Sequence, residues 1–324
     1  MSKTLIIGAG AIGRGFLAPI LFESGHKIDF VENQESTLDK FKKRNKFSTA
    51  LIKNNQYIFK EINFGKIYTP ETIKNIDDYD AIFLSVGVRN FLKYANFLSS
   101  AKLVFILENE FKSSSEFKKN SKNMNVFFGI PDVIVSNTAP EKLLAMDNLT
   151  VCAEEGDLIL EQGNYDINLG EIARKVNEKE LQSYWACKFF IHNTCHAIVA
   201  FLGAYTNCTY VHEAIKNEKI NQIVSKAMFV ITEALIDQKM VDKNDAKNYM
   251  ERELRRFRND LLHDPISRVA RDPLRKLAPE DRLIQALNLV NKSNLEIQNI
   301  CIGIKAALKY KGSTKEDAEY LNFL

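Results

Sequence analysis

An apolar strand pattern, a glycine-rich turn and a helical pattern follow one another at the N-terminus. Thr4–Ile7 is a short apolar run, Gly8-Ala-Gly10-Ala-Ile-Gly13 follows it at once, and Phe16–Phe22 carries apolar residues at helical spacing. In this context a G-x-G-x-x-G motif indicates a dinucleotide-binding fold. The first glycine permits the tight turn, the second lets a pyrophosphate approach the backbone, and the third lets helix and strand pack closely. The phosphates would lie against the helix N-terminus, where free N–H groups and the helix dipole favour an anion.

An acidic side chain follows the second predicted strand, Lys27–Val31. Glu32 lies about twenty residues after the glycines, where an acidic residue hydrogen-bonds the adenosine ribose of a bound dinucleotide. Since a carboxylate would repel a ribose 2′-phosphate, we expect NAD rather than NADP as the cofactor. Lys40, Lys42 and Lys43 are near enough in the sequence to leave NADP open.

Two further apolar runs, Asp80–Val86 and Leu103–Leu107, are typical of buried parallel strands. Ligands bind outside the carboxyl ends of such strands, so Val86-Gly87 and Glu108-Asn109 are expected to border the cofactor. The candidate cofactor-binding residues are therefore Gly8, Gly10, Ala11, Ile12, Gly13, Glu32, Val86 and Asn109.

The hydrophobic pattern changes near residue 180. Residues 1–180 alternate strand and helix patterns and predict a Rossmann-type α/β domain, whereas residues 181–324 predict an all-α domain. Two pairs of extended segments add to the first domain: an excursion from the main sheet, Phe47–Ile52 with Gln56–Phe64, and a closing hairpin, Leu149–Ala153 with Asp157–Leu160. Helical periodicity marks Glu178–Leu202, Ile220–Gln238, Asp242–Arg258 with Asp242 as its N-cap, Pro279–Val290, Leu295–Leu308 and Thr314–Leu321.

One segment of the helical half places three polar side chains together. At about 100° per residue on an α-helix, Lys188, Asn193 and His196 fall within an arc of roughly 140°. Lys188 has aromatic neighbours in the sequence, and because desolvation lowers the pKa of a lysine, burial would let it exchange a proton near neutral pH. Asn193 can donate a hydrogen bond to a carbonyl oxygen that gains negative charge, and His196 can orient the same oxygen. The alternative is an amphipathic core helix with polar residues at its rim.

A loop in the helical half concentrates four cations. Arg268, Arg271, Arg275 and Lys276 lie within nine residues, beside Pro265 and Pro273. Arginine forks bind phosphate and carboxylate bidentately, and lysine adds a point charge, so this loop is a candidate anchor for a phosphorylated substrate. The alternative is a solvated surface loop whose arginines pair with nearby aspartates, namely Asp264, Asp272 and Asp281.

Composition excludes several classes of function. The 44 basic and 41 acidic residues give a net charge of +3, which is too balanced to indicate a nucleic-acid partner. No apolar run of about 18 residues is present, so no membrane span is expected. The N-terminus has no signal-peptide layout and the five cysteines are scattered, so we expect a reduced, cytoplasmic protein without a disulfide framework or a metal site.

Several segments together resemble the polyol-specific long-chain dehydrogenases. They are Gly8–Phe16, Leu107–Asn109, the signature Lys188-x4-Asn193-x2-His196, Tyr210–Ile215, and Arg268–Leu277 with Asp281–Leu283. These segments run from the first strand to the last third, so the resemblance covers nearly the whole chain. It implies a Rossmann-type domain, an all-helical domain and an active site between them. It also implies metal-independent, nicotinamide-linked interconversion of a polyol and a ketose, commonly phosphorylated.

The resemblance assigns roles by position. It makes Lys188 the general acid–base, Asn193 a donor to the developing oxyanion, and His196 the residue that positions the substrate oxygen. Asp132 stands where the family places an Asn or Asp near the reacting oxygen. We therefore expect interconversion of a ketose phosphate, such as fructose 6-phosphate, and a hexitol phosphate.

The same comparison of positions extends to the cationic loop. Arg268 and Lys276 match substrate-contacting positions, and Arg271 and Arg275 are further candidates for a substrate phosphate. The longer relatives are often monomeric, so a monomer is expected.

Three departures from the family leave alternatives open. Val135-Ser-Asn-Thr138 replaces the usual Val-Asp-Arg-Ile, Cys195 stands where glycine is common, and the chain stops at Leu324 where relatives continue. The missing arginine and the shorter end would make room for a nucleotide-activated ketose phosphate, reduced to an activated polyol for surface polysaccharide synthesis. A third possibility is a dinucleotide-binding sensor without catalysis, although Lys188, Asn193 and His196 are all present.

Overall fold

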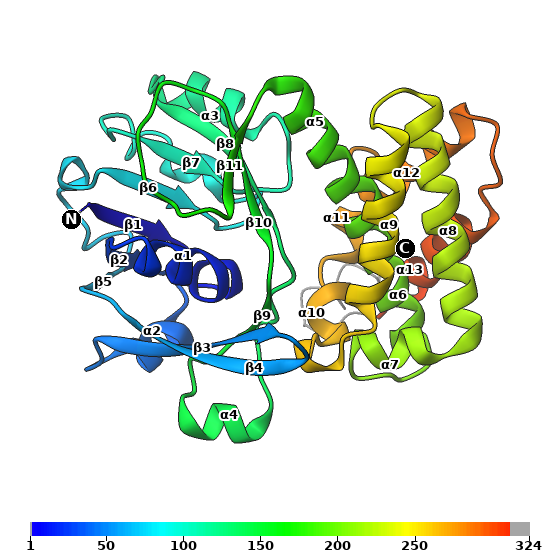
Figure 1. Cartoon of the computed structure of the whole chain (residues 1–324), viewed down its shortest axis with the longest axis horizontal. Helices are drawn as coiled ribbons and strands as arrows, with labels where there is room; N and C mark the ends of the chain where they lie inside the picture. Colours follow the sequence, from blue (N-terminus) through cyan, green and yellow to red (C-terminus); the bar gives the residue numbers. More distant parts are fainter. Residues whose placement is uncertain (1, 312–324) are drawn as a thin grey trace. The chain divides into compact units, whose positions relative to one another are not determined.

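The computed structural model describes residues 2–311 of the chain. The chain divides into two compact units, Met1–Leu181 and Gln182–Leu324 (Figure 1). The first is an α/β unit and the second is built from helices, so the predicted fold class is confirmed. The predicted helix at Thr314–Leu321 lies outside the described residues.

The first unit is organised around an eight-stranded sheet with the strand order β11-β10-β8-β7-β6-β1-β2-β5. The strands from β8 to β5 in this order are all parallel, as in a Rossmann-type sheet. β10 runs antiparallel to β8, and β11 runs parallel to β10. The strand bounds are β1 Lys3–Ile7, β2 Lys27–Val31, β5 Ile67–Tyr68, β6 Ala81–Leu84, β7 Val104–Ile106, β8 Val126–Asp132, β10 Asp157–Glu161 and β11 Ala173–Val176.

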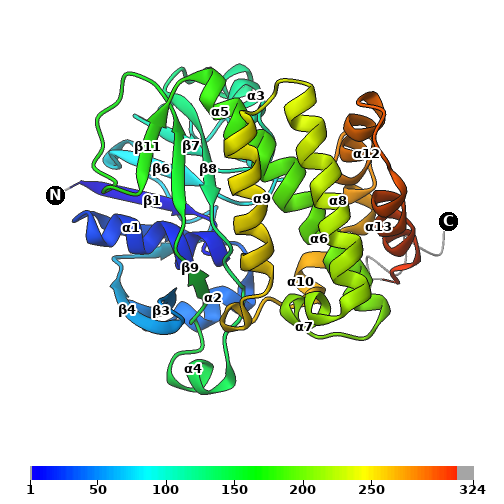
Figure 2. The ribbon, with the colours of Figure 1, turned by 45° about the vertical axis from the view of Figure 1, so that its right-hand side comes forward.

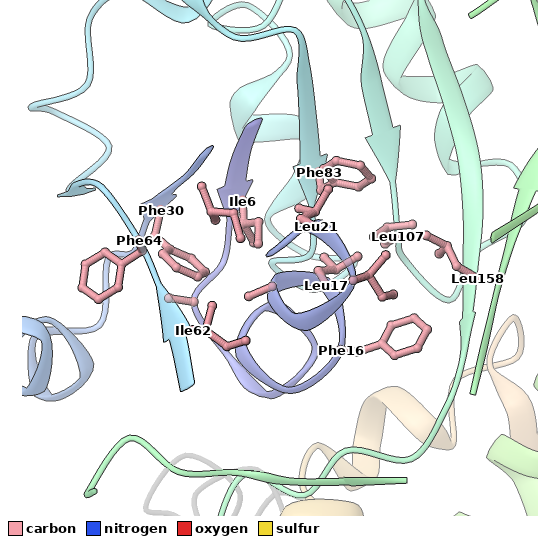
Figure 3. Close-up of a cluster of buried hydrophobic side chains, with 14 of the residues drawn as sticks. Ile6, Phe16, Leu17, Leu21, Phe30, Ile62, Phe64, Phe83, Leu107 and Leu158 are labelled. Atoms are coloured by element: carbon pink, nitrogen blue, oxygen red, sulfur yellow. The ribbon is translucent and has the colours of Figure 1, made fainter. Parts of the chain in front are cut away.

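Alternate residues of the central strands enter two hydrophobic clusters, one on each face of the sheet. Ile6 and Phe83 belong to the first cluster, where Leu17 and Leu21 of the first helical segment pack against the sheet (Figure 3). The second cluster holds the intervening strand residues, Leu5, Ile7, Ile82, Leu84, Val104 and Ile106. Because both faces are covered, these strands are continuous apolar runs in the sequence, and this made them predictable.

The helical segments of this unit are short. The first begins as a π-helix, Gly13–Leu17, and continues as α1, Ala18–Glu23. The others are α2 Glu35–Phe41, α3 Ser113–Ser121, α4 Glu141–Met146 and the 3₁₀ helices Ile76–Asp78 and Phe91–Tyr94.

A second, three-stranded sheet has the order β4-β3-β9. β3 (Lys46–Lys53) and β4 (Gln56–Asn63) form an antiparallel hairpin outside the main sheet, which confirms the predicted excursion. The predicted hairpin of Leu149–Ala153 with Asp157–Leu160 is wrong. β9 (Cys152–Glu154) pairs in parallel with β3, whereas β10 pairs with β8, because each strand finds its buried partner earlier in the chain.

Helices make up the second unit. α5, Glu178–Ala186, leads into a π-helix, Cys187–Asn193, which continues as α6, Thr194–Tyr205. The remaining helices are α7 Val211–Lys216, α8 Glu218–Asp237, α9 Lys243–Phe257, α10 Ile266–Ala270, α11 Pro273–Lys276, α12 Arg282–Lys292 and α13 Gln298–Lys309. Asp242 caps α9 as predicted, because its side chain accepts hydrogen bonds from the backbone N–H groups of Asn244 and Asp245.

α6 lies at the centre of the second unit (Figure 2). It contacts α7, α8, α10, α12 and α13, and every residue from Thr194 to Gly203 is buried. A helix that is apolar on all sides is stable only when other helices surround it. Among residues 2–311, no helix combines the length and the apolar character that crossing a bilayer requires.

Candidate active site

The predicted cofactor residues lie at one edge of the parallel sheet. The glycine-rich turn follows β1, Glu32 follows β2, Val86 follows β6 and Asn109 follows β7. Asp132, which was predicted to bind substrate, is the last residue of β8 and ends at the same edge. Because these strands are parallel and adjacent, their carboxyl ends meet at the same edge. The fold therefore brings residues that are far apart in the sequence to the place where α/β sheets bind ligands.

The three glycines of the turn differ in what surrounds them. A Cβ on Gly8, whose φ is +104°, would lie 2.1 Å from the carbonyl oxygen of Ser85, and a Cβ on Gly13 would lie 2.1 Å from that of Gly8. No atom of residues 2–311 lies within 4 Å of the position that a Cβ on Gly10 would occupy. Gly8 and Gly13 are thus required for packing, whereas the open space at Gly10 fits the approach of a pyrophosphate. Ala11 and Ile12 begin the helix beside that space.

Two glutamates hold the backbone at this edge. Oε1 of Glu32 accepts hydrogen bonds from the N–H groups of Asn33 (2.8 Å) and Gln34 (2.9 Å). Oε1 of Glu108 accepts from the N–H groups of Val86 and Gly87, both at 2.8 Å. Glu108 was expected at this edge beside Asn109, but no role in holding the backbone was predicted for it. It fixes the turn after β6 and occupies the N–H of Val86, so that a ligand can meet only the carbonyl and side chain of this residue.

Lys188, Asn193 and His196 lie on one buried helical segment of the second unit. They are 9%, 8% and 8% exposed. Lys188 and Asn193 stand five residues apart within the π-helix Cys187–Asn193. An α-helix would separate such residues by about 140° around its axis, whereas a π-helix closes its turn with i→i+5 hydrogen bonds and brings them onto nearly one face. The π turn therefore places Lys188 and Asn193 at closer positions around the helix axis than the α-helical pattern predicted.

His196 is held by the carboxylate of Asp264, which was predicted only as a possible partner of the loop arginines. Nε2 of His196 lies 2.9 Å from Oδ2 of Asp264, and Oδ1 of Asp264 accepts from Nε of Arg268 at 2.7 Å. Burial lowers the pKa of His196 despite the opposing effect of Asp264. Burial alone raises the pKa of Asp264, but Arg268 and His196 hold it below its usual value. A neutral imidazole thus donates from Nε2 to a carboxylate, and Nδ1 is left as an acceptor.

The cations of the loop form a cluster in which two arginines pair with aspartates and Lys276 contacts a backbone carbonyl. Arg275 Nη1 lies 2.6 Å from Asp281 Oδ2, so pairing of the loop arginines with aspartates holds for Arg275 and for Arg268. Lys276 is 4% exposed and donates to the carbonyl oxygen of Arg271. Burial and neighbouring arginines lower its pKa well below the usual value. Within residues 2–311, no carboxylate lies at ion-pair distance from Lys276, so the cluster can accommodate an anion.

Arg271 is exposed, and its carbonyl oxygen is the acceptor for Lys276. Arg282, on α12, is buried with its Nε 2.8 Å from Asp281 Oδ1. The carbonyl oxygen of Arg282 accepts from the hydroxyl of Thr194 at 3.2 Å, which ties the cationic region to the segment that carries Lys188.

The five cysteines are free thiols. In the part of the chain that the structure describes, no group of three or more His, Cys, Asp or Glu side chains is placed to hold a metal ion.

Comparison with known proteins gives concordant results for both units. Residues 2–113 match the mannitol dehydrogenase Rossmann domain, and residues 180–323 match the mannitol dehydrogenase C-terminal domain. The mannitol-1-phosphate 5-dehydrogenase of Clostridium acetobutylicum is 30% identical over 98% of this chain and 89% of the relative. The enzyme of the same name from Caldanaerobacter subterraneus is 30% identical over 98% of this chain and 88% of the relative.

A solved structure extends the comparison to the fold. Pseudomonas fluorescens mannitol 2-dehydrogenase, in a ternary complex with NAD and D-mannitol, has a TM-score of 0.77 at 15% identity, covering 99% of this chain and 83% of that chain. At this identity the likeness concerns the fold alone. The matches of both domains and of full-length relatives confirm the predicted class, a nicotinamide-linked polyol dehydrogenase, and the chain belongs to the mannitol dehydrogenase family.

Proposed function

We propose that this protein is an NAD-dependent dehydrogenase that interconverts fructose 6-phosphate and a hexitol phosphate, with mannitol 1-phosphate as the first hexitol phosphate to test. The observation that supports it most strongly is the π turn, which places Lys188 and Asn193 on nearly one face of a buried segment. The names of the curated relatives support the choice of substrate.

Three residues would carry out the proton chemistry. In the reductive direction the Lys188 ammonium gives its proton to the carbonyl oxygen of the ketose, and in the oxidative direction the neutral amine removes the hydroxyl proton. Asn193 donates to the oxygen as negative charge develops on it. The free Nδ1 of His196 accepts from a substrate hydroxyl, and Asp264 fixes the tautomer that allows this. NADH, when bound, supplies the hydride to the carbonyl carbon.

Charge at the cationic cluster supports a phosphorylated substrate. Lys276 has no carboxylate at ion-pair distance within residues 2–311, and Arg271 is exposed beside it. Arg268 and Arg275 already share carboxylates and would contribute through their remaining N–H groups. A phosphate dianion would offset the surplus of positive charge at this cluster.

We assign NAD rather than NADP on the basis of Glu32. Its carboxylate is anchored by two backbone N–H groups and is 9% exposed, so it cannot swing away from a ribose that approaches the edge. A 2′-phosphate placed there would meet a fixed like charge.

The test follows the absorbance of reduced nicotinamide with purified protein and fructose 6-phosphate, with NADH and NADPH in separate assays. We expect NADH to be consumed with fructose 6-phosphate and not with fructose, and a Lys188→Ala variant to lose the activity while it still binds NADH. Consumption only with a nucleotide-activated ketose phosphate would favour the activated-polyol alternative. Full activity of Lys188→Ala would contradict the proposed mechanism.

A further inference from the structure

A second imidazole lies on the segment that carries Lys188, and the proposed function does not use it. His192 is 4% exposed, and its Nδ1 lies 2.5 Å from Oε2 of Glu253, a fully buried residue of α9. The other carboxylate oxygen of Glu253 accepts from Nη1 of Arg256 at 2.8 Å and from Nε of Arg252 at 3.2 Å. His192 and Glu253 are 61 residues apart in the sequence.

Burial decides where the proton of this pair lies. It lowers the pKa of His192 to about 3, the charge of Lys188 adds to this effect, and Glu253 opposes it. Burial alone raises the pKa of Glu253, but His192 and Arg256 hold it below its usual value. At neutral pH the pair is therefore a neutral imidazole and a carboxylate. Because a carboxylate can only accept, Nδ1 of His192 carries the proton and Nε2 keeps a lone pair.

The two imidazoles of the segment are arranged in a complementary way. The rings of His192 and His196 lie 5.0 Å apart, and both contact Phe257, at 5.6 and 5.1 Å between ring centroids. The carboxylate partner binds Nδ1 in His192 and Nε2 in His196, so the rings keep opposite nitrogens as acceptors. Lys188 stands four residues before His192 in the π-helix, and its charge acts on both imidazoles and on Glu253.

The elements packed against this segment bring further charges. α9 supplies Arg252, Glu253 and Arg256, the buried side chains of α8 are apolar apart from Thr232, and α12 contributes Arg282, whose guanidinium binds Asp281. The segment itself supplies Cys195 and His196, the turn before α10 supplies Asp264, and α10 supplies Arg268. Of all these, Glu253 is the anion that directly contacts His192.

We propose that His192 and Glu253 form a positioning dyad that orients the Lys188 amine through Nε2 of His192 and holds a buried negative charge near it. This inference rests on the proposed role of Lys188. An acceptor nitrogen fixes the direction in which the amine gives or takes a proton, and reacting groups must be aligned closely for proton transfer to be efficient. The negative charge favours the protonated form of the amine.

Two substitutions of His192 test whether its Nε2 acceptor orients the amine. His192→Asn places an amide N–H near the former Nδ1 and removes the acceptor, whereas His192→Gln places an amide oxygen near the former Nε2. In the oxidation of mannitol 1-phosphate with NAD, we expect kcat to fall by about tenfold to a hundredfold in His192→Asn and clearly less in His192→Gln. NAD affinity should stay unchanged in both, and the fluorescence of Trp185, which stacks on Phe189, verifies that the second unit is folded.

Glu253→Gln tests the charge. Loss of a nearby negative charge destabilises the ammonium form, so the acidic limb of kcat/KM in the oxidative direction should move to lower pH. Asp242→Ala is the matched control, because it removes the N-cap of the same helix, α9, without touching Glu253. We expect it to share the loss of stability and to keep the pH profile of the unaltered protein.

The results that would contradict the role of the dyad differ from those that would contradict the proposed function. If the unaltered protein is active, Lys188→Ala is inactive, and His192→Asn and Glu253→Gln keep the original kcat and pH profile, the dyad proposal alone is overturned. Equal losses in His192→Asn and His192→Gln, or the same pH shift in Asp242→Ala, would also overturn it, because they indicate a purely structural role. Absence of activity in the unaltered protein, or full activity of Lys188→Ala, counts against the proposed function itself.

Discussion

Nε2 of His196 lies 2.9 Å from Oδ2 of Asp264, and the other oxygen of this carboxylate lies 2.5 Å from Nη2 of Arg268. One buried anion thus joins the α6 histidine, which carries a proposed role in orienting substrate, to the first arginine of the cationic loop. The contact fixes the tautomer of the imidazole and places the arginine at the same time. The two predicted parts of the substrate site are therefore one hydrogen-bonded unit.

Asp264→Asn should disrupt this unit without changing its volume. An asparagine amide can donate to Nε2 and so stabilise the other tautomer, in which Nδ1 no longer accepts from substrate. We expect kcat/KM to fall by about tenfold to a hundredfold, because alignment of the substrate oxygen is lost. Steady-state kinetics with fructose 6-phosphate and NADH would measure it. Asp260→Asn, an exposed carboxylate four residues earlier, is the control, and an equal effect there would contradict the role of Asp264.

Stability of the second unit should decrease on acidification. The folded-state pKa values of His192 and His196 lie below their ordinary values. Below about pH 6.5 the unfolded chain therefore binds more protons than the folded chain, and the free energy of unfolding decreases as the pH is lowered. For His192, whose folded pKa is about 3, the loss amounts to about 1.4 kcal/mol for each pH unit between 6.5 and 3. Trp185, the single tryptophan, stacks on Phe189 and reports unfolding of this region by fluorescence in urea.

His192→Gln should remove part of this pH dependence, because glutamine does not titrate. A flat profile for the unaltered protein between pH 7 and 5 would show that the buried imidazoles are not held neutral.

Substitutions at two glycines of the turn should separate an effect on stability from an effect on cofactor binding. Gly13→Ala would bring a Cβ against the backbone oxygen of Gly8, so we expect a loss of about 1–3 kcal/mol from overpacking. The Cβ of Gly10→Ala meets no atom of the described residues, so the thermal midpoint should stay unchanged while NADH affinity falls by at least about tenfold, or 1.4 kcal/mol. Thermal unfolding and NADH fluorescence titration measure the two effects. Unchanged NADH affinity in Gly10→Ala would contradict the placement of the pyrophosphate.

Short sequence patterns predicted the glycine-rich turn and the buried strands correctly, since both features depend on residues that are close together in the sequence. The turn from Gly8 to Gly13 depends on neighbouring residues, and the buried strands are marked by their own apolar side chains. The pairing of β9 and β10 was predicted wrongly, because nearness in sequence suggested a hairpin while their buried partners come from β3 and β8.

The sequence predicted only those parts of the candidate site whose residues lie close together in the chain. Lys188, Asn193 and His196 belong to one short sequence signature. Because the sequence was interpreted at α-helical spacing, the π turn that places Lys188 and Asn193 on nearly one face was not predicted. Glu253 is separated by 61 residues from the histidine it holds and Asp264 by 68, so tertiary packing alone brings them together.

Cofactor preference should depend on the charge of Glu32. Glu32→Gln keeps an oxygen that can accept from the N–H groups of Asn33 and Gln34, and it removes the charge that would repel a 2′-phosphate. We expect the ratio of kcat/KM for NADH over NADPH to fall by about tenfold, equivalent to 1.4 kcal/mol. Glu35→Gln, an exposed carboxylate three residues later, should leave the ratio unchanged. A preference for NADPH in the unaltered protein would contradict the assignment.

Binding of the substrate phosphate should draw a proton onto Lys276. Burial and the nearby Arg282 and Arg275 hold its pKa well below the usual value, and an adjacent dianion acts in the opposite direction, since it stabilises the ammonium form. Fructose 6-phosphate titrated into the protein saturated with NAD cannot react, so calorimetry in two buffers of different ionisation enthalpy reports proton uptake alone. We expect net uptake of up to about one proton near neutral pH, because one group changes its protonation state. Lys276→Met should abolish the uptake and weaken binding, whereas Lys292→Met, an exposed lysine of α12, should change neither. Equal proton uptake in Lys276→Met would place the phosphate away from this lysine.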